Sequence, residues 1–282
     1  MTGFSIDWLD LREAADRRAR EDKLLEQARH WLETDIAQGT GRTAVDLGAG
    51  TGSTLRAFST SSTQATDRKS LSWRLVDQDA ELLAEARLRH GGSHRLETHE
   101  LDLTDIAALP LEGAHLITAS ALFDLVSAHF IETLVGALQS QCQQQPVGFY
   151  SALNYDGTTR WTPAHPLDEA VLNAFNHDQQ RDKGFGLALG PDAGPYMERA
   201  FNRSGFRVFT ANSPWLLDGT DNKLVNALIT GIGDAVAANP ALDAASLQDW
   251  IQFRKAHTLT GTCIVGHSDL LALPNTIRMR SE

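Results

Sequence analysis

The residues VDLGAGTGS, Val45 to Ser53, give the clearest indication of how this chain folds. Three glycines at alternate positions, Gly48, Gly50 and Gly52, directly follow an apolar, β-branched run. Glycine weakens regular helices and strands, so this spacing indicates either backbone angles that other residues avoid or a ligand that touches the main chain. The run before the glycines predicts a strand, and STLRAFST after them, residues 53–60, predicts a helix. We therefore interpret the stretch as a strand, a tight turn and a helix.

The same alternation of strand and helix patterns continues on the C-terminal side. Strands are predicted at LSWRLVD (71–77), LETHELDL (96–103), HLITAS (115–120), PVGFYSAL (146–153), FRVFTAN (206–212) and within LTGTCIVGHSDLLALP (259–274). Helices are predicted at 80–90, 129–141, 221–238 and 241–256. Such alternation is typical of a parallel sheet covered on both faces. We predict an α/β fold: a Rossmann-like three-layer sandwich with a mostly parallel, seven-stranded sheet.

Segments outside this alternation suggest how the chain is organised. Residues 5–38 carry a broken helical period, so we expect an N-terminal helical cap over 1–40 and a main domain over 41–282. The polar stretch 60–70 predicts a surface loop. Two insertions are expected in the main domain, at about 154–202 and about 214–257. The first is rich in glycine and proline, which predicts a helical or irregular segment that forms a lid over the strand ends.

Composition excludes several classes of function. The chain has 282 residues, 42% of them hydrophobic, and 36 acidic against 25 basic residues, for a net charge of −11. No global positive field attracts phosphates, so we expect no nucleic-acid partner. Cys142 and Cys263 lie far apart without a CxxC motif, which fits a reducing cytoplasm. No signal peptide or membrane-spanning run is visible, and we expect a cytoplasmic protein without a membrane partner, either a monomer or a homodimer.

The order of residues in VDLGAGTG discriminates between two classes of nucleotide cofactor. A dinucleotide-binding fold has G-x-G-x-x-G, whereas this chain has Ser53 after Gly48, Gly50 and Gly52. A strand, an acidic residue and then G-x-G-x-G resembles instead the first motif of class I S-adenosylmethionine-dependent methyltransferases. The resemblance covers roughly residues 42–153. It implies that the main domain, 41–282, is a methyltransferase domain.

The resemblance implies a set of cofactor-binding residues in chain order. Asp77, at the end of RLVD, matches the acid that binds the ribose hydroxyls; Asp102 and Leu103 match the adenine contacts; and Ser120 to Phe123 match the segment under the sulfonium. The full set is Asp46, Gly48, Ala49, Gly50, Gly52, Asp77, Gln78, Asp102, Leu103 and Ser120. Simpler interpretations stay open: Asp77 as a helix cap, Asp102 as a turn residue, and Ser120 as an ordinary strand end.

Candidates for the methyl acceptor come from the first insertion. Methyl transfer needs a well-positioned acceptor, and a base where the acceptor loses a proton. We predict His165, His177 and Tyr155 as catalytic residues. Asn154, Arg160, Trp161, Gln179, Arg181 and Lys183 add polar and aromatic side chains that suit a polar, anionic small molecule, although any of them can instead lie on a solvated face.

Two further questions concern the N-terminal helices and metal ions. Arg12 or Arg20 reaches the cofactor's carboxylate if the first helix folds over the site; the favoured expectation is that both lie on a solvated face. His165 and His177 are twelve residues apart without a partner at ligand spacing, so we expect no metal.

Three functions are compatible with these residues. The favoured one is an S-adenosylmethionine-dependent methyltransferase that acts on a polar small molecule. The alternatives are a non-catalytic protein that binds S-adenosylmethionine or S-adenosylhomocysteine for regulation or assembly, and a nicotinamide-dependent oxidoreductase, which Ser53 disfavours.

Overall fold

The computed structural model describes residues 4–34, 42–59 and 71–275. The loop expected at 60–70 lies outside these segments. The strands are β1 (Arg42–Leu47), β2 (Leu71–Asp77), β3 (Arg95–Glu100), β4 (Leu116–Ser120), β5 (Gly148–Thr162), β6 (Phe206–Asn212), β7 (Trp215–Leu217) and β8 (Thr262–Pro274). The α-helices are α1 (Ile6–Ala19), α2 (Asp22–Thr34), α3 (Ser53–Ser59), α5 (Ala80–His90), α6 (Ala128–Gln141), α7 (Asp168–Gln179), α8 (Ala193–Arg203), α9 (Asn222–Val236) and α10 (Ala244–Ala256).

The strands form one sheet in the order β3-β2-β1-β4-β5-β8-β6, with β7 paired to β8 beside this path. Strands β1 to β5 pair in parallel, and β8 is antiparallel to β5, β6 and β7. The mostly parallel α/β sandwich is confirmed, but the strand number is not: the described residues hold eight strands rather than seven. The additional strand, Trp215–Leu217, is three residues long and too short to show a strand period in the sequence.

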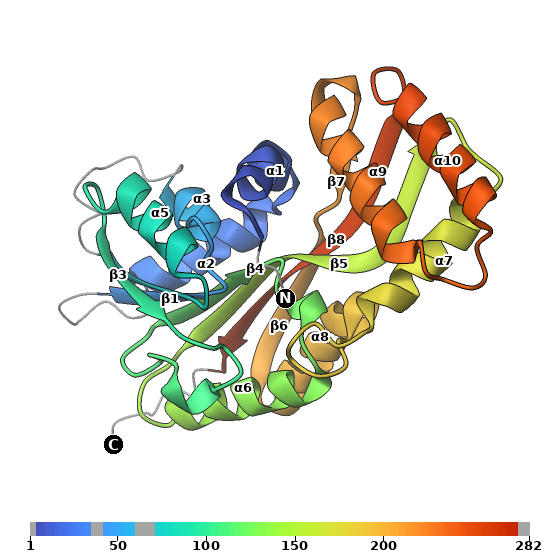
Figure 1. Ribbon diagram of the computed structural model, residues 1–282. Helices are drawn as coiled ribbons and strands as arrows, with labels where there is room; N and C mark the ends of the chain where they lie inside the picture. Colours follow the sequence, from blue (N-terminus) through green and yellow to red (C-terminus); the bar gives the residue numbers. More distant parts are fainter. Residues whose placement is uncertain (1–3, 35–41, 60–70, 276–282) are drawn as a thin grey trace.

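Helices cover both faces of the sheet (Figure 1). Successive residues of β1 contribute to different cores. Val45 and Leu47 of β1 belong to the core under α6 and α8, whereas Ala44 belongs to the core under α2, α3 and α5. Both faces are apolar at the centre of the sheet, which is why β1 and β4 are nearly continuously buried, whereas the edge strand β3 (RLETHE) is mostly polar. The two cores fix the position of the strand ends.

Strands β5 and β8 continue past the sheet into a second lobe that also contains β7, α7, α9 and α10 (Figure 1). Arg254 of α10 is buried in this lobe, where it binds both carboxylate oxygens of Asp168 at the start of α7. Residues 154–202 hold more regular secondary structure than their many glycines and prolines suggest, because several of those glycines and prolines lie near the ends of helices. Pro195, for example, lies in the first turn of α8, where a missing N–H costs nothing.

Helix α1 lies between the helices on the upper face of the main sheet and the second lobe (Figure 1). It packs against β7 and α9, so the N-terminal segment bridges the two parts of the molecule. Over residues 4–34, 42–59 and 71–275, no helix combines the length and apolar character needed to cross a membrane.

Candidate functional site

The glycine loop lies at the carboxyl end of β1, between β2 and β4. Strand order reverses direction here, which is where open α/β sheets bind ligands. Gly48, Gly50 and Gly52 have φ angles of 64°, 51° and 86°. These left-handed angles are costly for residues with a Cβ, so the loop requires its glycines. The predicted strand, turn and helix are therefore present.

Asp77 holds the glycine loop from the neighbouring strand. The Gly50 amide donates to Asp77 Oδ2 at 2.8 Å, and the Asp79 amide donates to Asp77 Oδ1 at 3.0 Å. Burial raises the pKa of Asp77, and the Gly50 amide opposes that shift. The helix cap of α5 is Asp79, whose carboxylate accepts from the Glu81 and Leu82 amides. The interpretation of Asp77 as a helix cap is therefore wrong.

Asp46 lies beneath the loop and inside the sheet. Its Oδ1 accepts a hydrogen bond from Thr118 Oγ1 of β4 at 2.7 Å. Burial raises its pKa to about 6, while Thr118 and the charge of Arg20 lower it. Ala49 is also buried, and its amide donates to the carbonyl of Val76 at 3.0 Å. These residues give the loop a rigid base.

The predicted adenine contacts lie after β3. Asp102 is exposed and accepts hydrogen bonds from the amide and hydroxyl of Thr104, which lower its pKa. Leu103 is buried in the core, and Gln78 after β2 is exposed. The contacts of Asp102 are those of a turn residue, and its role toward a cofactor stays a prediction.

Arg20, at the end of α1, reaches the opposite side of the glycine loop. Its Nη2 donates to Ser120 Oγ at 2.9 Å and to Ser53 Oγ at 3.3 Å. The residue is 5% exposed, and its Nη1 is buried with no hydrogen-bond partner. The expectation that Arg12 and Arg20 lie on a solvated face is wrong, because α1 folds back over the strand ends. Ser120 is likewise more than a strand end, since it orients this guanidinium.

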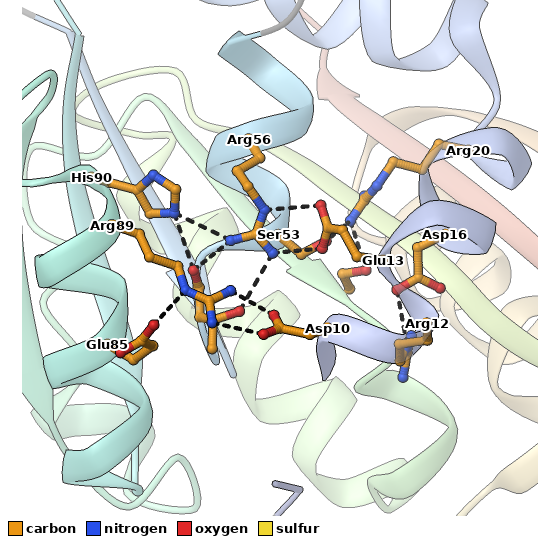
Figure 2. A network of polar contacts seen from close by, with 12 residues as sticks. Asp10, Arg12, Glu13, Asp16, Arg20, Ser53, Arg56, Glu85, Arg89 and His90 are labelled. Atoms are coloured by element: carbon orange, nitrogen blue, oxygen red, sulfur yellow. Dashed lines mark hydrogen bonds and ion pairs between the residues drawn. The ribbon is translucent and has the colours of Figure 1, made fainter. Parts of the chain in front are cut away.

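Ion pairs attach α1 to the helices around the loop (Figure 2). Arg56 of α3 binds Glu13 through two nitrogens, and Arg89 of α5 binds Asp10 through two nitrogens. A Cβ on Gly50 would lie 3.1 Å from Leu9 Cδ1. The segment that covers the glycine loop is therefore α1, whereas the lid was predicted in the insertion at 154–202.

Side chains with polar groups recur at intervals of four residues along α1: Trp8, Arg12, Asp16 and the C-cap Arg20. The first three lie toward the second lobe, whereas Arg20 reaches the glycine loop. Arg12 Nε donates to Asp16 Oδ2 at 2.8 Å, and Trp215 Nε1 donates to Asp16 Oδ1 at 3.0 Å. The Arg12 guanidinium also lies over the Trp215 ring, 5.4 Å from its centroid. This spacing was a signal in the sequence that hydrophobic periodicity alone does not reveal.

Two buried titratable residues near Arg12 were not predicted, Asp124 and His267. Asp124 lies just after β4 and is 9% exposed; burial raises its pKa to about 6, while its own amide, the Arg12 charge and the Tyr155 amide lower it. His267 of β8 is 7% exposed, and burial lowers its pKa to about 3. Asp124 Oδ1 and His267 Nδ1 have no hydrogen-bond partner.

The predicted catalytic residues lie elsewhere. Tyr155 is buried in the second lobe; its hydroxyl donates to Asn176 Oδ1 at 2.8 Å, and burial raises its pKa to about 12. His165 faces Asp249 of α10 at 3.4 Å, and His177 is exposed on α7. The structure does not bring these two histidines to the glycine loop, because α7 packs on the outer part of β5.

The other polar candidates of the insertion have local partners. Asn154 is buried and accepts from Ser151 Oγ, whereas Arg181 and Lys183 both pair with Asp178. Trp161 packs against Trp250, Arg160 pairs in register with Ile264 of β8, and Gln179 is the last residue of α7. In the described segments no three His, Cys, Asp or Glu side chains gather as a metal site would require.

The burial of Asp124 leads to a stability prediction. Asp124→Asn is expected to raise the free energy of unfolding at pH 7 by about 1 to 3 kcal/mol, since one pKa unit corresponds to about 1.4 kcal/mol. A carboxyl whose pKa is higher in the folded state than in the unfolded state destabilises the protein as the pH rises from the unfolded-state pKa to the folded-state pKa. The gain should therefore be small near pH 4 and full above pH 6. Urea denaturation of both proteins at pH 4 and pH 7 measures it; a difference independent of pH would contradict it.

Comparisons with known proteins give structural matches alone. No family model and no curated protein matches the chain. The YcgJ protein from Bacillus subtilis is 12% identical over 88% of this chain and 98% of that one, with a TM-score of 0.50. The cyclopropane synthase MmaA2 from Mycobacterium tuberculosis is 11% identical over 96% and 94%, with a TM-score of 0.49. Geranyl diphosphate C-methyltransferase from Streptomyces coelicolor A3(2) is 13% identical over 89% and 81%, with a TM-score of 0.42. The match to YcgJ shows a common fold.

Proposed function

We propose that this chain is an S-adenosylmethionine-dependent methyltransferase that acts on a polar small molecule. The observation that carries the proposal is the glycine loop at the carboxyl end of β1, held by Asp77 through the Gly50 amide. The loop lies at the point of the sheet where strand order reverses, and its sequence resembles the first motif of class I methyltransferases.

The residues around the loop fit the chemical groups of this cofactor. Each Asp77 oxygen accepts one hydrogen bond from the backbone and has a second lone pair for a ribose hydroxyl. Arg20 Nη1 is a buried donor without a partner, as a carboxylate-binding group would be before its ligand arrives. Ser53 and Ser120 orient this guanidinium. When bound, S-adenosylmethionine supplies the methyl group on a sulfonium.

The chain's own residues then have separable tasks. Asp77 binds and orients the ribose, and Arg20 binds the carboxylate at the other side of the loop. Leu9, which lies against Gly50, excludes water from that side. Holding the reactants together in a dry site is the main contribution that an enzyme makes to an in-line methyl transfer.

A non-catalytic binding protein is the second candidate. Asp124 and His267 each have a buried polar atom without a hydrogen-bond partner, which lowers the stability of the fold. This favours the enzyme, because a protein that only binds the cofactor gains nothing from such atoms. We keep the cytoplasm as the proposed compartment, on the two unpaired cysteines, and a monomer or homodimer as the proposed state.

The test of the proposed function is calorimetric titration with S-adenosylmethionine and S-adenosylhomocysteine. We expect saturable binding by the wild-type protein. Asp77→Ala removes a charged hydrogen-bond acceptor, so affinity should fall by about 1.5 to 3 kcal/mol, or roughly ten- to 150-fold.

Asp79→Ala is the matched control for this titration. It removes the neighbouring carboxylate, which caps α5, and should lower stability by about 1 kcal/mol with little effect on binding. If the wild-type protein binds neither compound, the glycine loop holds another ligand and the proposed function is wrong.

A further inference from the structure

Four polar atoms around α1 are buried and have no hydrogen-bond partner in the described residues: Trp8 Nε1, Arg20 Nη1, Asp124 Oδ1 and His267 Nδ1. A buried polar atom without a partner lowers stability, so native proteins hold few of them. Arg20 is explained above by the proposed cofactor. Trp8 and His267 lie toward the second lobe, and Asp124 lies after β4, two residues beyond Leu122, which lies against Gly48 of the glycine loop.

Contacts and charges place Asp124 and His267 around the same arginine. The Arg12 guanidinium acts on the pKa of both residues, and it lies over the Trp215 ring. The His267 ring centroid is 5.0 Å from that of Trp215 and 6.4 Å from that of Tyr155, whose amide in turn acts on Asp124. Trp8 precedes Arg12 by one helical turn. This cluster therefore draws on α1, β5, β7, β8 and the turn after β4.

The position of Asp124 relates the cluster to the reaction. Asp124 follows Ser120 by four residues, and Ser120 binds Arg20 beside the glycine loop. Residues 121–123 therefore lead from Ser120, beside the proposed cofactor, to Asp124, which lies in the 3₁₀ helix Phe123–Leu125. Ala121, directly after Ser120, has a φ of 51°, an angle that non-glycine residues rarely adopt and that concentrates at functional sites.

We propose that the Asp124 carboxylate receives the proton of the methyl acceptor, an amine or hydroxyl group, at the junction of α1, β5 and β8. The acceptor nitrogen or oxygen forms the bond to the methyl carbon, the carbon–sulfur electron pair returns to sulfur, and the acceptor's proton passes to Asp124 Oδ1. This inference rests on the proposed function and gives it an acceptor class.

The neighbours of Asp124 narrow that class. Arg12 forms one hydrogen bond through Nε, and in the described part of the chain its two terminal nitrogens have none. A guanidinium with free donors suits an anionic group. Trp8 and Trp215 contribute aromatic surface. The arrangement suits a small molecule with an amine or hydroxyl next to a carboxylate or phosphate.

Sinefungin provides a test that needs no knowledge of the acceptor. This analogue carries an amine in place of the methyl group of S-adenosylmethionine, so its charged nitrogen points toward the acceptor. If Asp124 lies there, the wild-type protein should bind sinefungin at least tenfold more tightly than S-adenosylhomocysteine at pH 7.5. Asp124→Asn should remove most of this preference and leave the affinity for S-adenosylhomocysteine within about twofold.

The control is Asp249→Asn, which makes the same chemical change at an exposed carboxylate of α10. It should leave both affinities unchanged. Equal losses for both ligands in Asp124→Asn, or no wild-type preference for sinefungin, would overturn the inference and leave the proposed function standing. A wild-type protein that binds neither ligand would instead overturn the proposed function itself.

A second measurement uses the wild-type protein alone and needs no variant. Protonation of Asp124 should reduce the preference for sinefungin between pH 7.5 and pH 5. The charged and titratable groups around it are Arg12 and Asp16 of α1, which form an ion pair, Tyr155 of β5 and His267 of β8. Burial raises the pKa of Tyr155 and lowers that of His267, so both stay neutral in this range. Asp46 titrates near the loop but acts on both ligands. A ratio of affinities that is constant with pH would overturn the inference.

Discussion

Asp269→Ala is expected to lower the free energy of unfolding by about 3 to 5 kcal/mol, the usual cost of removing one member of a buried charged network. Asp269 of β8 is 0% exposed. It is therefore inaccessible to water, and no solvent molecule replaces the hydrogen bonds that its carboxylate accepts.

The carboxylate joins three separate segments. Its Oδ1 accepts from the Leu153 amide at 2.8 Å and from Ser213 Oγ at 2.6 Å, and its Oδ2 accepts from the Glu21 amide at 2.9 Å. Leu153 has a φ of 58°, so Asp269 also supports a strained residue at the bulge of β5. Glu21 follows Arg20, and loss of this contact should loosen the α1–α2 junction.

Urea denaturation followed by circular dichroism measures the effect, with two variants for comparison. Asp243→Ala removes an exposed carboxylate that caps α10 and should lower the free energy of unfolding much less than Asp269→Ala does. Ser213→Ala removes one of these donors and should lower the free energy of unfolding by about 1 kcal/mol. If Asp269→Ala costs no more than these two, the carboxylate does not hold the junction together.

The sequence predicts those parts of the molecule whose signals are local. The bounds expected for β2 (Leu71–Asp77) and β6 (Phe206–Asn212) are the observed ones, because each is a short apolar run with polar or turn residues on both sides. The glycine loop is equally local, since its backbone angles require glycine whatever surrounds it. The position of Asp77 beside the loop could also be predicted, because the carboxyl ends of the neighbouring parallel strands β1 and β2 lie at the same edge of the sheet.

The polar cluster beyond α1 could not be predicted in this way. Arg12, Asp124 and His267 lie on three elements far apart in the chain, and their proximity depends on how α1 packs against the second lobe. Two signals were nevertheless present: the spacing of four between Trp8, Arg12, Asp16 and Arg20, and the polar pair His267 and Asp269 on one face of an otherwise apolar strand. Histidine is a common catalytic residue, which is why the sequence favoured His165 and His177. His165 lies against α10 and His177 lies on α7, and neither is near the glycine loop.

Arg20→Met is expected to weaken binding of S-adenosylhomocysteine by about 2 to 5 kcal/mol, or roughly thirtyfold to several thousandfold. The guanidinium is buried beside Ser53 and Ser120, so a carboxylate bound there loses a charge partner that water does not replace. 5′-Methylthioadenosine lacks the amino-acid part of the cofactor. Its affinity should therefore stay within about threefold of the wild-type value in the same calorimetric titration.

The comparison of these two ligands separates a direct contact from a structural role. Arg20 also faces Asp46 and Asp269, so its loss can disturb the α1–α2 junction and weaken both ligands alike. Equal losses would mean that Arg20 acts through the fold, and unchanged binding of both would place the carboxylate elsewhere. Arg17→Met changes an exposed arginine on the same helix and should affect neither ligand. A loss confined to S-adenosylhomocysteine has a single physical cause, a carboxylate on Arg20, and would identify α1 as part of the cofactor site rather than a cap outside it.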